Sequence, residues 1–152
     1  MDAFDSDVLI YAAAPEHPLG RRVAALFPAG PVGDDDPPIG VGSLLLLPEV
    51  LGKPLRDGAT EEVSALAGLL ARLDLRPFDR ATAELATVLS STYRLRAADA
   101  AHLATAVAVG ANRFITNNQR DFPATISEIQ IRYPDDLPDS ATRRAEPPES
   151  PG

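Results

Sequence analysis

Four acidic residues lie in apolar surroundings where a carboxylate needs a partner. They are Asp5, Asp7, Glu49 and Asp99. The first two follow a short apolar segment, the third lies in a leucine-rich run, and the fourth lies in an alanine-rich segment. A buried carboxylate is costly unless it is paired or bound to a cation. Carboxylate oxygens are the ligands that Mg²⁺ and Mn²⁺ prefer, so these residues indicate a divalent-metal site.

Each of these acids also has a structural interpretation. Asp5 or Asp7 could cap a helix, although one cap requires only one of them. Glu49 could lie exposed after a kink at Pro48. Asp99 could stabilise a helix N-terminus through the helix dipole. These alternatives remain open from the residues alone.

A further polar group follows the apolar residues Phe114 and Ile115. Thr116, Asn118 and Asp121 come in close succession there, and they could line a site or close an Asx-type turn. Asp99 also begins a narrow polar stripe with His102 and Thr105 at helical spacing. Because the sequence offers no nearby second imidazole, we expect His102 to be a hydrogen-bonded core histidine rather than a metal ligand.

Composition excludes several other kinds of site. The chain has 152 residues, no Cys and two His, so thiolate chemistry and a three-histidine zinc site are excluded. It lacks a nucleophile elbow, a Walker lysine loop and a dinucleotide-binding glycine motif. No apolar run is long enough for a membrane span and no secretory signal is visible, so we expect a cytoplasmic protein with no membrane partner.

The net charge of −8 does not exclude a nucleic-acid partner. The four acids above account for half of that excess, and a bound cation would cancel part of their charge.

Short apolar segments alternate with helical patterns along the chain. We expect strands over residues 3–4, 39–41, 75–78, 113–116 and 129–131. We expect helices over residues 8–13, 19–27, 44–51, 60–73, 80–95 and 97–109. This alternation predicts an α/β fold, a three-layer α/β/α sandwich with a central parallel sheet. Ligands of such sheets bind at the carboxyl ends of the strands, where Asp5, Asp7 and Thr116 are expected.

The chain divides into one domain and a tail. Residues 1–133 contain all the expected elements and form a domain of ordinary size. Residues 134–152 are rich in proline and charge and poor in large apolar side chains, so we expect a disordered tail.

Four segments together resemble the signature blocks of PIN-domain nucleases, most closely the VapC-type toxins of bacterial toxin–antitoxin pairs. They are residues 5–12, Glu49, residues 99–106 and residues 114–122. The resemblance extends from residue 2 to about residue 133. It implies a metal-dependent endoribonuclease that uses Mg²⁺ or Mn²⁺, cleaves RNA, forms a homodimer and is inhibited by a cognate antitoxin.

The resemblance also assigns roles to residues. It implies that Asp5, Glu49 and Asp99 are the catalytic, metal-binding acids, that Asp7 is a polar residue beside the first of them, and that Thr116 lines the site. Asn118 stands where the family commonly has Asp; its amide oxygen can still bind a cation but adds no charge.

Three more residues are candidates near that position. Asp121 could substitute for the missing acid at Asn118, or it could be structural. Arg96 and Arg120 could hold phosphate, or they could be solvated surface residues.

Two alternatives to an active nuclease remain at this stage. The departure at Asn118 allows a catalytically weakened PIN-like module that binds RNA or protein. The acids would also suit a phosphatase or another metal hydrolase, but residues 5–9 match only the first half of the phosphatase nucleophile motif.

Overall fold

The computed structural model describes residues 1–139. Within them the chain forms a five-stranded sheet, six α-helices and a 3₁₀ turn. The strands are β1 (Asp2–Phe4), β2 (Gly40–Ser43), β3 (Leu73–Arg76), β4 (Arg113–Ile115) and β5 (Gln130–Arg132). The helices are α1 (Ser6–Ala12), α2 (Pro18–Ala24), α3 (Leu46–Arg56), α4 (Thr60–Leu70), α5 (Arg80–Tyr93) and α6 (Ala97–Ala108), and the 3₁₀ turn is η1 (Pro134–Asp136).

The sheet is parallel throughout, with the strand order β3-β2-β1-β4-β5. The chain builds outward from β1 through β2 to β3 and then returns to place β4 against the other edge of β1. In the register, Phe4 lies beside Ile115. The order therefore reverses between β1 and β4, which is where open parallel sheets form a crevice for ligands.

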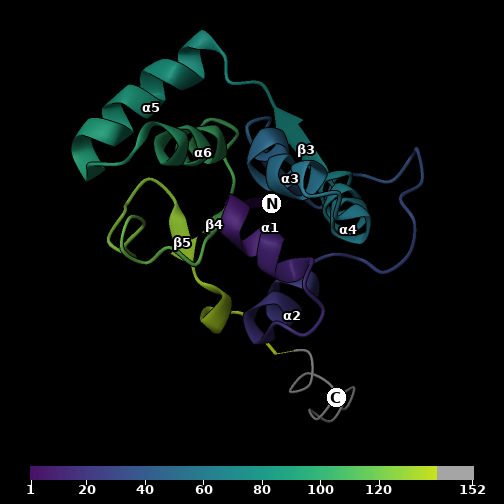
Figure 1. Ribbon diagram of the computed structural model, residues 1–152. Helices are drawn as coiled ribbons and strands as arrows, with labels where there is room; N and C mark the ends of the chain where they lie inside the picture. The colour runs from purple at the N-terminus through teal and green to yellow at the C-terminus, as the bar shows by residue number, and fades with distance from the viewer. Residues whose placement is uncertain (140–152) are drawn as a thin grey trace.

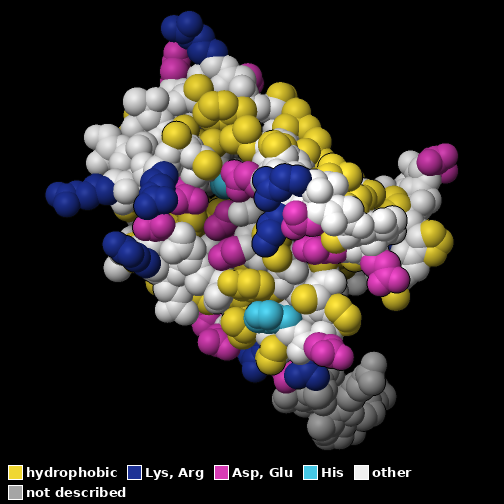
Figure 2. Space-filling model, in the orientation of Figure 1, with side chains coloured by type: hydrophobic (Ala, Val, Ile, Leu, Met, Phe, Trp, Pro, Cys, Tyr) yellow, Lys and Arg dark blue, Asp and Glu magenta, His cyan; other side chains and the backbone are white. Residues whose placement is uncertain are grey.

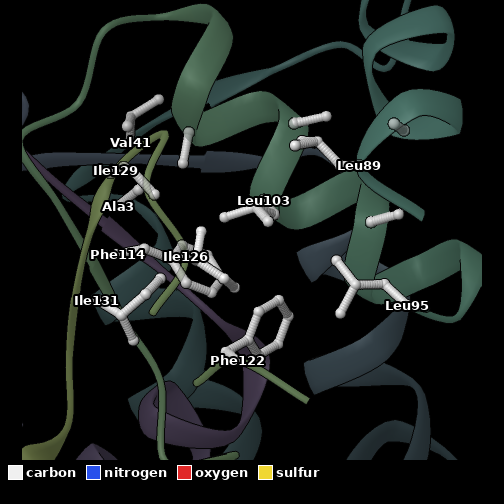
Figure 3. Packing of buried hydrophobic residues seen from close by; sticks show 14 residues of the cluster. Ala3, Val41, Leu89, Leu95, Leu103, Phe114, Phe122, Ile126, Ile129 and Ile131 are labelled. Atoms are coloured by element: carbon white, nitrogen blue, oxygen red, sulfur yellow. The ribbon is translucent and has the colours of Figure 1, made fainter. Parts of the chain in front are cut away.

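Helices cover both faces of the sheet (Figure 1). Alternating strand residues point to opposite faces: Ala3 and Phe114 belong to the core beneath α5 and α6, whereas Phe4 and Ile115 belong to the core beneath α1, α3 and α4. Figure 3 shows the first core, in which Leu103 of α6 faces strand residues and Phe122. The predicted three-layer α/β/α architecture is confirmed.

Local capping residues begin and end the helices that frame the site. Asp5 caps α1 by accepting a hydrogen bond from the Ser6 amide. Asp79 caps α5 by accepting a hydrogen bond from the amide of Thr82. After α6, Gly110 has φ of 71°, a left-handed conformation that favours glycine.

Several boundaries differ from the predictions; α2 ends at Ala24 rather than near residue 27, and β3 covers residues 73–76 rather than 75–78. Leu73 continues the apolar period of the preceding helix, yet α4 ends at Leu70 and Leu73 begins β3 beside Gly40. An apolar residue at position 73 suits the buried face of a helix and a buried strand equally well. The apolar periodicity of the sequence could therefore not distinguish helix from strand there. In addition, α3 runs to Arg56, past Pro54, rather than ending near residue 51.

The packed chain extends beyond the predicted domain boundary at residue 133. Pro134 begins η1, and Leu137 is 2% exposed in the core beneath α1, α3 and α4. Arg22 of α2 donates hydrogen bonds to the carbonyls of Asp135 and Leu137. Residues 134–137 are thus docked against α2, and residues 140–152 of the expected tail lie outside the described residues.

No helix between residues 1 and 139 is both long enough and apolar enough to span a membrane.

Candidate active site

Asp5 lies at the carboxyl end of β1, where the chain turns into α1. Its side chain is 4% exposed and accepts hydrogen bonds from the Ser6 amide at 2.8 Å and the Thr116 hydroxyl at 2.9 Å. Thr116 is in reach because it directly follows β4, the parallel neighbour of β1. Burial raises the pKa of the Asp5 carboxyl above its ordinary value, and the nearby charge of Glu49 adds to this effect.

Asp7 lies in the first turn of α1 and faces the same edge of the sheet. Its Oδ2 accepts a hydrogen bond from the Asn117 amide at 3.1 Å. Its Oδ1 is buried and has no hydrogen-bond partner among residues 1–139. Burial, and then repulsion from Asp5, raise the pKa of Asp7 to about 7. This carboxylate therefore has one oxygen that the described part of the chain does not satisfy.

Asp99 and Glu49 reach the site from opposite layers. Asp99 lies in the first turn of α6, and its pKa is raised by burial and by the charges of Asp5 and Asp121. Glu49 lies in the first turn of α3, and its Oε1 is 2.9 Å from Nε2 of His102. That hydrogen bond lowers the pKa of Glu49. The fold thus gathers the acids singled out in the sequence into one electrostatically linked cluster.

The residues after β4 form a closed turn. The Asn118 amide group donates to Asp121 Oδ2 at 2.9 Å, and its oxygen accepts from the Asp121 amide at 3.2 Å. The Asn118 backbone amide donates in turn to the Thr116 hydroxyl. Asn118 therefore orients the Asp121 carboxylate, whose negative charge contributes to the raised pKa of Asp99. This arrangement favours the Asx-turn interpretation of Asn118 over direct metal ligation.

The two arginines remain outside this network. Arg96 precedes α6 and Arg120 lies in the turn after β4; both are exposed, and their side chains make no hydrogen bond or ion pair with any residue the structure describes. Figure 2 shows acidic side chains gathered in the middle of the face shown, with basic side chains beside them. The face thus combines an acidic centre with basic surroundings.

His102 is the hydrogen-bonded core histidine that the sequence predicted, because it is 2% exposed and its Nε2 contacts Glu49 Oε1. Its partner, Glu49, is what sequence reasoning missed. Burial alone would lower the pKa of His102; the hydrogen bond with Glu49 and the charge of Asp5 outweigh burial and raise it. The stripe that His102 shares with Asp99 was the available signal, but nothing in the sequence placed α3 opposite it.

Comparison with known proteins identifies the family. The family model described as PIN domain matches residues 3–126. The chain belongs to the PIN domain family. PIN domains are generally nucleases, and PIN-domain nucleases generally use divalent metal ions.

A solved structure, a toxin-antitoxin complex from Klebsiella pneumoniae, contains a chain that resembles this PIN domain in fold. The TM-score is 0.67 and the two chains are 24% identical, over 88% of this chain and 98% of that chain. No match was found among curated proteins.

The donor set of this PIN domain suits a hard divalent cation. Asp5, Asp7 and Asp99 offer oxygen ligands, their raised pKa values reflect burial and a local excess of negative charge, and Asp7 Oδ1 is unsatisfied. Within residues 1–139, however, no three acidic or histidine side chains already stand in metal-binding geometry. A cation would therefore have to draw these side chains together.

We expect the metal-free PIN domain to lose stability as the pH rises from about 5 to about 8. Asp7, with a pKa of about 7 against an ordinary 3.8, keeps a proton in the folded state that it loses in the unfolded chain. Asp5, Asp99 and His102 also have raised pKa values, which act in the same direction. Thermal melts in chelator should show a melting temperature lower by roughly 5 °C or more at the higher pH.

The Asp7→Asn variant is the control for this pH dependence. It removes the group with the pKa of about 7 and should flatten the profile. A wild-type melting temperature that stays constant or rises over this pH range would contradict the electrostatic description of the cluster.

Proposed function

We propose that this PIN domain is a metal-dependent endoribonuclease that uses Mg²⁺ or Mn²⁺ and acts as the toxin of a toxin–antitoxin pair. The observation that carries the proposal is the cluster of carboxylates at the carboxyl end of β1, where Asp5 is buried, Asp7 and Asp99 are half-buried, and Asp7 keeps one buried oxygen unsatisfied. Such a cluster is stabilised by a divalent cation, and its position at the strand-order reversal is where a ligand binds in this class of sheet.

The proposed roles follow from the position of each acid. Asp5 and Asp99 are direct ligands, because Asp5 is buried, Asp99 is half-buried, and the charge of Asp5 acts on Asp99. Asp7 and Glu49 complete the site through water or orient the attacking water. When bound, the cation lowers the pKa of water and neutralises charge on the phosphodiester. Thr116 holds Asp5 in place through its hydroxyl.

Asp121 supports an active enzyme over a catalytically weakened binding module. The weakened alternative rested on Asn118 lacking a charge. Asn118 instead orients the carboxylate of Asp121, and that carboxylate lies close enough to Asp99 to raise its pKa. We propose that Asp121 supplies the negative charge that Asn118 lacks.

Replacing Asn118 with aspartate should destabilise the metal-free protein by about 1 kcal/mol. The substitution removes the amide donor and places a second carboxylate against Asp121. Thermal melts in chelator measure the effect. Gln119→Asp is the matched control, because it adds the same charge at an exposed neighbouring position. Equal melting temperatures for the two variants would show that Asn118 does not hold Asp121 in this way.

Incubation with structured RNA tests the enzymatic proposal. We expect cleavage in Mn²⁺ or Mg²⁺, no cleavage in chelator, and no cleavage by Asp5→Asn purified in the same way. A single-stranded DNA of the same sequence distinguishes a ribonuclease from a general nuclease. Cleavage by Asp5→Asn at the wild-type rate would show that the activity does not come from this site.

The toxin role is supported by the likeness in fold to a chain from a toxin-antitoxin complex. We expect a small gene for a DNA-binding antitoxin beside the gene for this chain, and we expect its product to bind this protein and stop cleavage. Co-expression and co-purification test this partner. Sedimentation of the purified chain tests the homodimer that the sequence resemblance implies.

A further inference from the structure

His102 makes one polar side-chain contact in the part of the molecule described. Its side chain is 1% exposed, and its Nε2 lies 2.9 Å from Glu49 Oε1. Its Nδ1 is buried and makes no hydrogen bond to any residue from 1 to 139. The polar interaction of the imidazole is thus directed at Glu49.

Glu49 depends on such a contact for its orientation. Its side chain is 31% exposed at the start of α3, and a glutamate in this position has several flexible torsions that solvent leaves free. The core clusters place α3 and α6 against opposite faces of the sheet. The bond between Glu49 and His102 therefore joins the two helical layers across the carboxyl edge of the sheet. The Ser6 side chain also lowers the pKa of this carboxylate.

We propose that His102 is a positioning residue that holds the Glu49 carboxylate toward the Asp5 and Asp99 cluster. This inference rests on the proposed metal-dependent function. His102 does not serve as a ligand in this arrangement, because Nε2 is directed at Glu49 and Nδ1 is enclosed in the protein interior. Residues that orient a metal ligand by a hydrogen bond commonly change metal affinity by about 10- to 100-fold when they are removed.

Calorimetric titration with Mn²⁺ tests the inference in the metal-free protein. His102→Leu introduces an apolar side chain of similar volume that lacks the Nε2–H donor. We therefore expect the dissociation constant for Mn²⁺ to rise roughly tenfold. His102→Gln can place an amide nitrogen near the position of Nε2 and should bind within about threefold of wild type. Glu49→Gln, alone and combined with His102→Leu, completes a double-mutant cycle.

The cycle separates a positioning role from a general structural one. If His102 acts through Glu49, His102→Leu has no further effect on Mn²⁺ affinity in the Glu49→Gln background. Equal losses in both backgrounds, or a His102→Gln variant as weak as His102→Leu, would overturn the inference. Absence of Mn²⁺ binding by the wild type would overturn the proposed function along with it, whereas unchanged binding by His102→Leu would overturn this inference alone.

Imidazole nitrogen NMR gives a second readout that does not require the leucine variant to fold. The chain has two histidines, so a His17→Gln variant assigns the signals. We expect the His102 Nε2 resonance to shift in Glu49→Gln while the His17 resonances stay in place. A His102 spectrum unchanged by Glu49→Gln would show that the contact does not exist in solution and would overturn the inference.

Discussion

Replacing Asp99 with asparagine should reduce metal-dependent RNA cleavage by at least about 100-fold while leaving the metal-free protein at least as stable as wild type. Asparagine has nearly the same shape, so the start of α6 keeps its packing. The substitution removes a charge that burial disfavours and that Asp5 and Asp121 repel, which are the causes of the raised pKa of Asp99. Cleavage assays in Mn²⁺ and thermal melts in chelator measure the two effects on one preparation.

The combination of effects distinguishes a metal ligand from a structural residue. Asp34→Asn is the matched control. Asp34 lies in the exposed loop before β2, so this substitution removes the same charge at a position outside the site. That variant should cleave RNA at the wild-type rate. A clear loss of stability in Asp99→Asn, or cleavage equal to that of Asp34→Asn, would argue that Asp99 is not a ligand.

Replacing Thr116 with valine should lower both stability and cleavage. Thr116 is fully buried; its hydroxyl donates to Asp5 and accepts from the Asn118 amide. Valine has a similar shape but leaves both groups unsatisfied, which should cost roughly 1–3 kcal/mol of unfolding free energy. Because Asp5 loses the contact that orients it, we expect cleavage to fall by about tenfold or more.

Thr116→Ser is the matched variant for this test. It keeps the hydroxyl and loses only a methyl group, so it should retain most of the activity and differ from wild type in stability by about 1 kcal/mol. Chemical denaturation and initial cleavage rates compare the two variants. If serine and valine reduce cleavage equally, the hydroxyl does not orient Asp5.

The fold was largely predictable because local and tertiary preferences agree. The short strands β1 and β4 each end in two apolar residues, Asp79 caps α5, and Gly110 follows α6, so periodicity and capping point to the same elements. The prediction was wrong at Leu73, where burial is compatible with either helix or strand. It was also wrong at residues 134–137. This segment is mostly polar, so its composition did not indicate that Leu137 is buried in the core.

The candidate site was predictable only as a set of acids. Sequence reasoning could place Asp5 after a strand, and the parallel register then brings Thr116 beside it. The pairing of Glu49 with His102 could not be predicted, because it depends on how two helices from opposite layers meet. The turn that joins Asn118 to Asp121 was left open, since an amide at that position suits both a turn and a ligand.

The most direct test of the account is the anomalous diffraction of crystals soaked in Mn²⁺, recorded on either side of the manganese absorption edge. We expect a manganese peak within coordination distance of the Asp5 and Asp99 carboxylates, with Asp7 and Glu49 bound directly or through water. The same experiment on Asp5→Asn should show a much weaker peak. A fully soaked wild-type crystal with no manganese at this cluster would contradict the central claim that these carboxylates form a metal centre.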